Sequence, residues 1–352
     1  MSKLKDAVYH KIDRLQHGGI MTNYQCNAAC RHCLYACSPE RSGGYIQPKM
    51  AEKICGLLHE AGCRSVHIGG GEPFLSIDGL IMLLETARKN GITVEYVETN
   101  AFWAESEQRA VEYLRALSKA GADTLCISLD PFHAEYVPAV LPIKLAEICR
   151  NEGFGCFLWQ DKYRTMLSRV QNPHKVQSRV ELERQLSPNY ILEAARAYGL
   201  SMGGRALSIE AEYGTPKPLA DIIAACHTTP RLINSNNAEA PAQKKPCRNL
   251  LSAGHFHVDL HGQYIPPGCT GIIIPLKEAI SGVPIGKYPA FDALVSGGVA
   301  GLFDLALIHG FKPKATYTSS CALCFHIRHY LSGQKGFPEL DAEHYVASLT
   351  YC

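Results

Sequence analysis

Residues 18–33 read GGIMTNYQCNAACRHC, and residues 64–73 read RSVHIGGGEP. In each stretch a short β-rich run ends in unusual residues: three cysteines in the first, and three glycines followed by an acid in the second. Further β-rich runs occur at residues 93–100, 123–130, 154–160 and 200–207. Runs of this kind, separated by helical segments, predict parallel strands whose carboxyl ends meet at one edge of a sheet.

Helical periodicity fills most of the spaces between these runs, at residues 48–62, 78–91, 106–121, 134–153 and 191–199. These segments end in Gly or Asn-Gly, or run up to Gly, a common helix stop. The alternation predicts an α/β fold, either an open doubly wound sheet or a barrel. In both, the active site lies at the carboxyl ends of the strands. Residues 161–187 are polar and basic, and we interpret them as a solvated helix rather than an insertion over a barrel mouth.

Bulk composition excludes several classes of protein. The 352 residues carry 35 basic and 33 acidic side chains, so there is no positive excess for nucleic acid. No apolar run approaches the ~18 residues of a membrane helix. The opening MSKLKDAVYHKIDRL is amphipathic and lacks the apolar core of a signal peptide, which predicts a cytoplasmic protein. The expected organisation is an N-terminal helix or lead-in (1–16), a core domain (17–207), a linker (208–245) and a small C-terminal domain (246–352).

Cysteine is abundant, at 15 residues, and its first cluster is C-x-x-x-C-x-x-C at Cys26, Cys30 and Cys33. In a reducing cytosol, clustered cysteines more often bind metal than form disulfides. A zinc ion would need a fourth ligand, which Cys37 or His32 could supply. Three thiolates alone can instead hold three irons of a [4Fe–4S] cluster and leave the fourth iron open.

The glycine run at residues 69–73 helps to choose between these alternatives. It contains no G-x-G-x-x-G and no Walker lysine, and Glu72 would repel phosphate but could accept hydrogen bonds from an ammonium group. The two motifs together resemble the radical S-adenosylmethionine (SAM) superfamily, over about residues 17–207. The resemblance implies a six-stranded partial (β/α) barrel in which Cys26, Cys30 and Cys33 hold a [4Fe–4S] cluster whose open iron binds SAM.

The same resemblance implies a set of SAM-binding residues. Gly70, Gly71, Glu72 and Pro73 match the motif that contacts the methionine amino group. Ser128 and Arg205, at the ends of the fourth and sixth expected strands, match positions that touch the ribose and carboxylate. Asn100, at the end of the third, completes the expected SAM-binding set. His32 departs from the aromatic residue that the family often has before its third cysteine.

A second group of cysteines follows the expected linker: Cys247, Cys269 and the C-x-x-C of Cys321 and Cys324. The runs HFHVDL and QYIPP meet at His261-Gly262, which predicts a hairpin in the segment between Cys247 and Cys269. Four cysteines suit zinc or an iron–sulfur cluster. The arrangement resembles the twitch module, a shortened SPASM domain, which implies one auxiliary [4Fe–4S] cluster with an electron-transfer role. His255 and His257 alternate onto one face of the first run, and we interpret them as structural or solvent-facing.

The resemblance implies that one electron, from reduced ferredoxin or flavodoxin, leads to cleavage of SAM and to hydrogen abstraction from a substrate. Glu98, Asp130 and His133 are candidates for moving protons at the mouth of the barrel. Oxidation of a small molecule is favoured, because the roughly 25 residues before Cys26 are few for a leader-recognition domain. The alternatives are a peptide- or protein-modifying maturase and, more remotely, a non-catalytic zinc-binding interaction protein.

Overall fold

The computed structural model describes residues 9–41, 44–159, 161–198, 203–228 and 242–350. Its main sheet has eight strands in the order β10-β9-β8-β2-β3-β4-β5-β6. These strands are β2 (Gly18–Met21), β3 (Ser65–Gly69), β4 (Thr93–Thr99), β5 (Thr124–Ser128), β6 (Gly155–Trp159), β8 (Phe256–Val258), β9 (Gln263–Ile265) and β10 (Ile274–Pro275). The six from β8 to β6 run parallel, whereas β9 and β10 are antiparallel. The predicted α/β class with a parallel sheet is confirmed.

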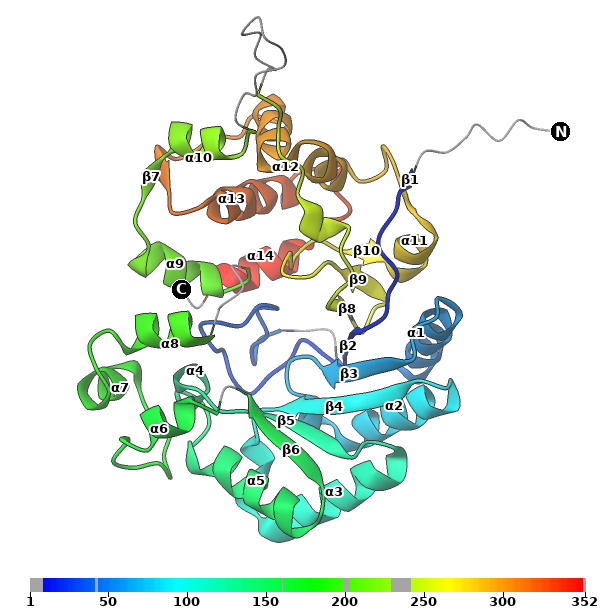
Figure 1. Cartoon of the computed structure of the whole chain (residues 1–352), viewed down its shortest axis with the longest axis vertical. Coiled ribbons are helices and arrows are strands. Elements are labelled where there is room, and N and C mark those ends of the chain that lie inside the picture. Colours follow the sequence, from blue (N-terminus) through cyan, green and yellow to red (C-terminus); the bar gives the residue numbers. More distant parts are fainter. Residues whose placement is uncertain (1–8, 42–43, 160, 199–202, 229–241, 351–352) are drawn as a thin grey trace, which may run out of the picture.

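Four helices cover one face of this sheet (Figure 1): α1 (Pro48–Glu60), α2 (Ile77–Lys89), α3 (Glu107–Ala120) and α5 (Val140–Asn151). Each matches a segment predicted from periodicity. Helix α2 shows why: its buried residues Leu80, Leu83, Leu84 and Ala87 follow the helical repeat. Helix α3 ends where predicted, because Gly121 adopts the left-handed conformation (φ 112°) and terminates it.

The sixth predicted strand, at residues 200–207, is wrong for the part that the structure describes. Residues 203–205 form a turn and α9 (Ala206–Tyr213) begins directly after them, while residues 200–202 lie outside the described residues. The parallel set is completed at its other edge by β8, whose residues Phe256–Val258 pair with Gly18–Ile20. The predicted hairpin is confirmed, since β8 pairs antiparallel with β9 around a turn at Gly262 (φ 77°).

Short helices follow the carboxyl ends of β5 and β6: α4 (Pro131–Ala134), α6 (Tyr163–Leu167), α7 (Arg179–Gln185) and α8 (Tyr190–Tyr198). Residues 161–187 thus form two short helices and turns rather than one solvated helix. The expected linker also contains structure, namely α9, β7 (Lys217–Pro218) and α10 (Leu219–Ala225), although residues 229–241 lie outside the described residues.

The C-terminal segment forms a helical layer above the sheet in Figure 1. Its elements are α11 (Leu276–Ser281), β11 (Val283–Pro284), α12 (Pro289–Ile308), β12 (Thr316–Tyr317), α13 (Ser320–Ser332) and α14 (Ala342–Leu349). At the other end of the chain, residues 9–16 contain no helix. Instead β1 (Tyr9–His10) pairs with β11, which corrects the expected N-terminal helix for the residues described.

Helix α12 corrects the expectation that no apolar run approaches the length of a membrane span. In the described part of the chain it is the one helix with that length and composition, with a mean hydropathy of 1.7 over its best 18-residue window. Core helices of soluble proteins can have the same length and composition. Buried residues of α12 include Phe291, Leu294 and Leu302, and its backbone is broken at Gly298 (φ 58°).

Candidate active site

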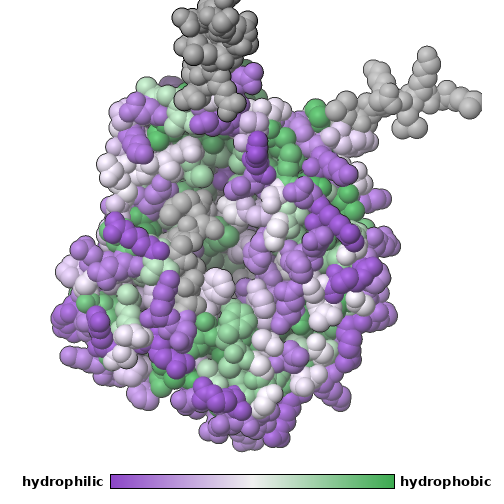
Figure 2. Space-filling model, in the orientation of Figure 1, coloured by the Kyte–Doolittle hydropathy of each residue, from purple (hydrophilic) through white to green (hydrophobic). Residues whose placement is uncertain are grey.

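A cavity of about 490 Å³ opens at the carboxyl ends of the parallel strands. Most residues singled out in the core sequence line it: Cys26, Cys30, Cys33, Gly70, Gly71, Glu72, Pro73, Glu98, Asn100, Ser128 and His133. Figure 2 shows a hollow in this face of the molecule, with apolar side chains on its lower side over β5 and β6. Phe157 and Trp159 of β6 are 39% and 41% exposed there.

The loop that carries Cys26, Cys30 and Cys33 (the cysteine loop) and the glycine motif at residues 70–73 are in direct contact in one wall of this cavity. The backbone N–H of Gly71 donates to the Asn23 carbonyl (2.8 Å), and that of Glu72 donates to the Gln25 carbonyl (3.1 Å). A Cβ at Gly71 would lie 1.9 Å from the Gln25 carbonyl oxygen. Glycine is therefore needed because the two loops pack backbone to backbone, a reason that concerns the chain itself rather than a ligand.

Two of the three thiols accept hydrogen bonds from this same loop. The Sγ of Cys26 accepts from the Ala28 N–H and the Sγ of Cys33 from the Cys37 N–H, both at 3.4 Å. A hydrogen bond from the Cys37 thiol, and the positive charge of Arg205, hold the pKa of Cys33 well below its usual range. Backbone donors of this kind favour the thiolate, which is the form that binds iron.

Glu72 is 1% exposed, and burial raises its pKa to about 7. Its carboxylate accepts hydrogen bonds from the N–H groups of Phe74 (3.1 Å) and Asn100 (2.8 Å) and from the Thr99 hydroxyl (3.0 Å). It thus ties the glycine motif to the end of β4. The Asn100 side chain is also engaged, because its amide donates to Asn27 Oδ1 at 2.8 Å.

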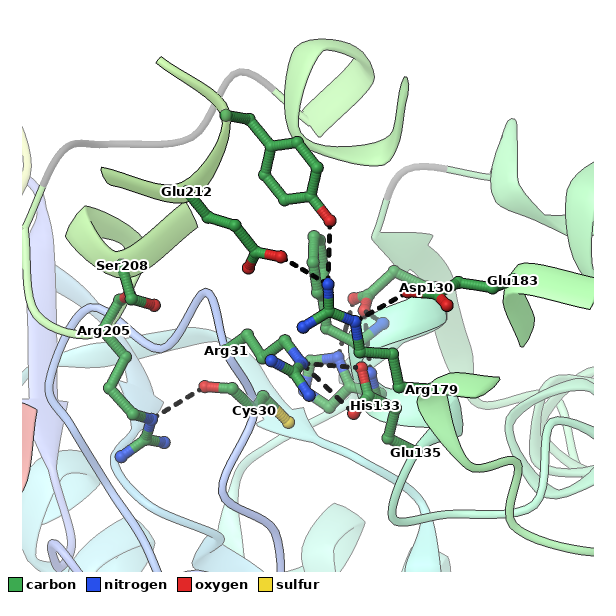
Figure 3. A network of polar contacts seen from close by, with 12 residues as sticks. Cys30, Arg31, Asp130, His133, Glu135, Arg179, Glu183, Arg205, Ser208 and Glu212 are labelled. Atoms are coloured by element: carbon green, nitrogen blue, oxygen red, sulfur yellow. Dashed lines mark hydrogen bonds and ion pairs between the residues drawn. The ribbon is translucent and has the colours of Figure 1, made fainter. Parts of the chain in front are cut away.

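Arg205 is buried and does not line the cavity. Its guanidinium donates to the carbonyls of Cys30 (2.9 Å) and Cys37 (2.6 Å), as Figure 3 shows for Cys30. These two hydrogen bonds clamp the cysteine loop, and the expected contact with a SAM carboxylate stays a prediction. Arg31 secures the same loop from the other side through Glu135 (3.3 Å).

The three candidates for proton transfer lie in different settings. Glu98 lines the cavity, where burial and the nearby Glu72 raise its pKa to about 7. Asp130 is 1% exposed and caps α4, accepting from the N–H groups of Phe132 and His133 at 2.9 Å. His133 contacts Asp130 through Nδ1 at 2.6 Å. Burial alone would lower the pKa of His133, but Asp130 and Cys30 hold it well above its usual value.

The second cysteine group also converges, from three segments of the chain. Cys247 precedes a 3₁₀ turn (Arg248–Leu250), Cys269 follows β9, and Cys321 and Cys324 lie in the first turns of α13. A hydrogen bond from the Cys269 thiol lowers the pKa of Cys247 to about 6. Burial, together with the charges of Cys324 and Cys247, raises the pKa of Cys321 to about 11.

Two further residues border this second group. The buried Arg328 of α13 hydrogen-bonds to Cys324 and donates to the Thr270 carbonyl at 2.7 Å. Burial raises the pKa of Cys226, at the end of α10, and the nearby charge of Cys324 adds to that effect. The sequence analysis did not single out Cys226.

The spacing of the thiols bears on which metal each group could hold. Four thiolates around one zinc ion lie about 3.8 Å apart, since each Zn–S bond is about 2.3 Å. Within the described residues, the sets of three or more ligand atoms that all lie within 4.8 Å of one another contain only His and Asp side chains. No set of three thiols in the described residues is that compact, although Cys33 with Cys37 and Cys247 with Cys269 lie within hydrogen-bonding distance.

Sequence reasoning missed several residues of the cavity wall, namely Tyr35, Tyr96, Thr99, Cys126 and Trp159. Side chains at every second position of a strand share one face. This periodicity could have placed Tyr96, Cys126 and Trp159 on the inner face of their strands. Cys126 is buried, at 5% exposure, and forms part of the cavity wall.

Comparison with known proteins adds the family. Residues 20–158, which run from β2 to β6, match the family model described as the radical SAM superfamily. Residues 20–158 thus form a radical SAM domain. This is a superfamily of enzymes, and the matched segment contains both the three-cysteine loop and the glycine motif.

One curated relative of the chain is "Putative peptide biosynthesis protein YydG" of Bacillus subtilis (strain 168), 26% identical over 113 residues. The matched segment covers 32% of this chain and about a third (35%) of that protein. Solved structures with a loose overall likeness include Streptococcus suis SuiB bound to S-adenosylmethionine (16% identity, TM-score 0.41, 81% of this chain and 67% of that one). Another is anSMEcpe with bound AdoMet (15% identity, TM-score 0.42, 91% and 97%).

Proposed function

We propose that this enzyme holds a [4Fe–4S] cluster on Cys26, Cys30 and Cys33, binds SAM beside it, and abstracts hydrogen from a peptide substrate in the cavity. The observation that carries the proposal is the direct packing of the cysteine loop against residues 70–73 in the wall of a 490 Å³ cavity. Cavities of a few hundred cubic ångströms suit small ligands. When bound, the reduced cluster supplies the electron that splits SAM into methionine and a 5′-deoxyadenosyl radical.

The chain's own residues orient and protect these groups. Arg205 and Arg31 hold the cysteine loop in place, and Glu72 fixes the end of β4 next to the glycine motif. Residues 70–73, Asn100 and Ser128 form the wall against which SAM would lie. Glu98 faces the same space and, with a pKa of about 7, can take or give a proton there. Asp130 holds His133 beside Cys30, so these two residues act on the cysteine loop.

We further propose that Cys247, Cys269, Cys321 and Cys324 hold an auxiliary [4Fe–4S] cluster. When bound, that cluster accepts the electron that an oxidised substrate loses. The chain supports it with converging thiols and with Arg328, a buried cation that offsets the charge of the thiolates. Reduced ferredoxin or flavodoxin is the proposed electron donor. The cysteines of the described residues are free thiols, in keeping with a cytoplasmic location.

A peptide is favoured as substrate because the curated relative carries the name of a peptide biosynthesis protein. The exposed aromatic side chains of β6 beside the cavity give a peptide an apolar surface to bind. Oxidation of a small molecule, the expectation from the sequence, is the alternative outcome of the test below.

The first test replaces Cys26, Cys30 and Cys33 together by Ala in anaerobically reconstituted protein. Iron should fall from about eight to about four per chain, and formation of 5′-deoxyadenosine should stop. Cys55→Ala, at a buried position in α1, is the matched control and should keep the full iron content and the formation of 5′-deoxyadenosine. Continued 5′-deoxyadenosine formation by the triple variant would show that the cluster assignment is wrong.

The second test concerns the substrate. Extract fractions from cells should be assayed for stimulation of 5′-deoxyadenosine formation above the uncoupled background. A peptide substrate predicts stimulation that is lost when the fraction is digested with a protease that is then removed. Stimulation that survives complete digestion would contradict the peptide proposal and favour a small molecule.

A further inference from the structure

Three histidines meet on one side of the cavity, although two strands that carry them are far apart in the sequence. His67 comes from β3, His257 from β8, and His255 directly precedes β8. Their ligand nitrogens all lie within 4.8 Å of one another. The Nε2 atoms of His67 and His257 are 3.0 Å apart, and the ring centroids of His67 and His255 are 4.9 Å apart.

Strand β2 lies between β3 and β8, and its residue Gly19 makes this meeting possible. A Cβ at Gly19 would lie 2.3 Å from the Nε2 of His67 and 2.6 Å from the Cδ2 of His257. Gly19 is not among the glycines with a positive φ, so its backbone conformation suits any residue. The glycine is needed for the space that the two rings occupy above β2.

The spacing of the ring nitrogens suits metal binding. Zn–N bonds of about 2.0–2.1 Å in a tetrahedron place nitrogens about 3.3 Å apart. The 3.0 Å between the buried pair is close to that spacing.

We propose that His67, His255 and His257 form a binding site for one divalent transition-metal ion of the zinc class. The site is distinct from both cysteine groups and goes beyond the proposed function. His67 and His257 are 2% and 8% exposed, which fixes two ligands, while the exposed His255 turns from its stacked position to supply the third. His255 and His257 line the cavity, and Glu98 Oε1 is 3.9 Å from His67 Nε2.

Three protein ligands leave a coordination position open toward the cavity, the arrangement found in catalytic rather than structural zinc sites. An ion there would bind an oxygen of a substrate, such as a carboxylate or amide carbonyl, and hold it against the wall formed by β2, β3 and β8. This assigns a chemical role to the histidine pair that the sequence alone indicated as structural or solvent-facing.

The test uses full-length protein with its clusters built anaerobically, so that the thiols are occupied. Zn²⁺ is added in competition with a chromogenic chelator, and bound zinc and iron are counted by mass spectrometry. Wild-type protein should bind about one zinc per chain, with a zinc absorption edge showing nitrogen and oxygen neighbours and no sulfur. His255→Ala, which changes an exposed residue, should weaken zinc binding at least tenfold without loss of iron.

Gly19→Ala is the sharper variant, because it displaces the rings without removing a nitrogen, and it should weaken zinc binding to a similar extent. His59→Ala, an exposed histidine of α1, is the matched control and should bind zinc like the wild type. Absence of bound zinc in the wild type, a sulfur-ligated ion, or equal zinc affinity in all variants would each overturn the proposal.

Discussion

Gly71 illustrates how a single residue controls the site. Its missing side chain lets residues 70–73 lie against the cysteine loop, with the Gln25 carbonyl in the space that a Cβ would fill. Arg205 is a second such residue, because one guanidinium binds the carbonyls of Cys30 and Cys37 and so holds both ends of that loop. Both residues act on the shape of the loop.

At this scale we predict that Gly71→Ala destabilises the fold by about 2 kcal/mol, because backbone atoms must move to make room. It should also lower the iron retained by the first cluster. Gly56→Ala in α1 is the control, since its nearest neighbour would be 3.8 Å away and helix propensity favours Ala by about 0.5–1 kcal/mol. Chemical denaturation measures both variants, and equal midpoints would count against this account of Gly71.

Arg205→Lys tests the second residue. Lysine retains the charge but lacks the planar fork that reaches two carbonyls, so the loop should loosen at a cost of about 1–3 kcal/mol. Iron retention by the first cluster should fall several-fold, while the affinity for SAM per loaded cluster stays within about twofold. Full iron content with weakened SAM binding would instead support the contact with the SAM carboxylate that the sequence indicated.

At the scale of elements, α13 connects the second cysteine group to the rest of the C-terminal layer. Its first turns carry Cys321 and Cys324, and its middle carries Arg328, which binds the backbone of the loop after Cys269. Metal bound to these thiols would join α13 to the loop after β9 and to the segment that follows the linker.

We therefore predict that changing Cys321 and Cys324 together to Ala removes about four irons per chain and lowers the thermal midpoint. Formation of 5′-deoxyadenosine should persist, because the first cysteine loop is intact, while conversion of substrate is lost. Cys226→Ala is the control, since that thiol lies near Cys324 and is not one of the proposed ligands. Loss of four irons from Cys226→Ala would show that the ligand set is wrong.

At the scale of the whole molecule, the domain boundary expected at residue 207 does not separate two independently built domains, because both sides of it contribute strands to the main sheet. Strand β8, from the C-terminal segment, pairs in parallel with β2 and buries Phe256 and Val258. The backbone of Asp13 also donates to the Leu251 carbonyl, which links the first residues to the same segment. The cavity is thus built by both halves of the chain, since His255 and His257 form part of its wall.

A chain ending at residue 207 should consequently fail to fold cooperatively, because the edge of β2 and the apolar surface under β8 would be exposed. Limited proteolysis and circular dichroism during heating measure this. Coexpression of residues 208–352 should restore a compact, protease-resistant complex. A cooperatively folded 1–207 fragment that holds its cluster would show that β8 is dispensable.

The sequence by itself determined the local features of this protein: the helices α1 to α3, the first five parallel strands, the hairpin of β8 and β9, and the two groups of cysteines. These follow from periodicity, turn residues and short spacings, which act within a few residues of chain. Only the tertiary structure decided that β8 rather than residues 203–207 supplies the sixth parallel strand, that Arg205 clamps the cysteine loop, and that His67 meets His257. Such contacts depend on which distant surfaces fit together in space, and no local pattern in the sequence encodes that fit.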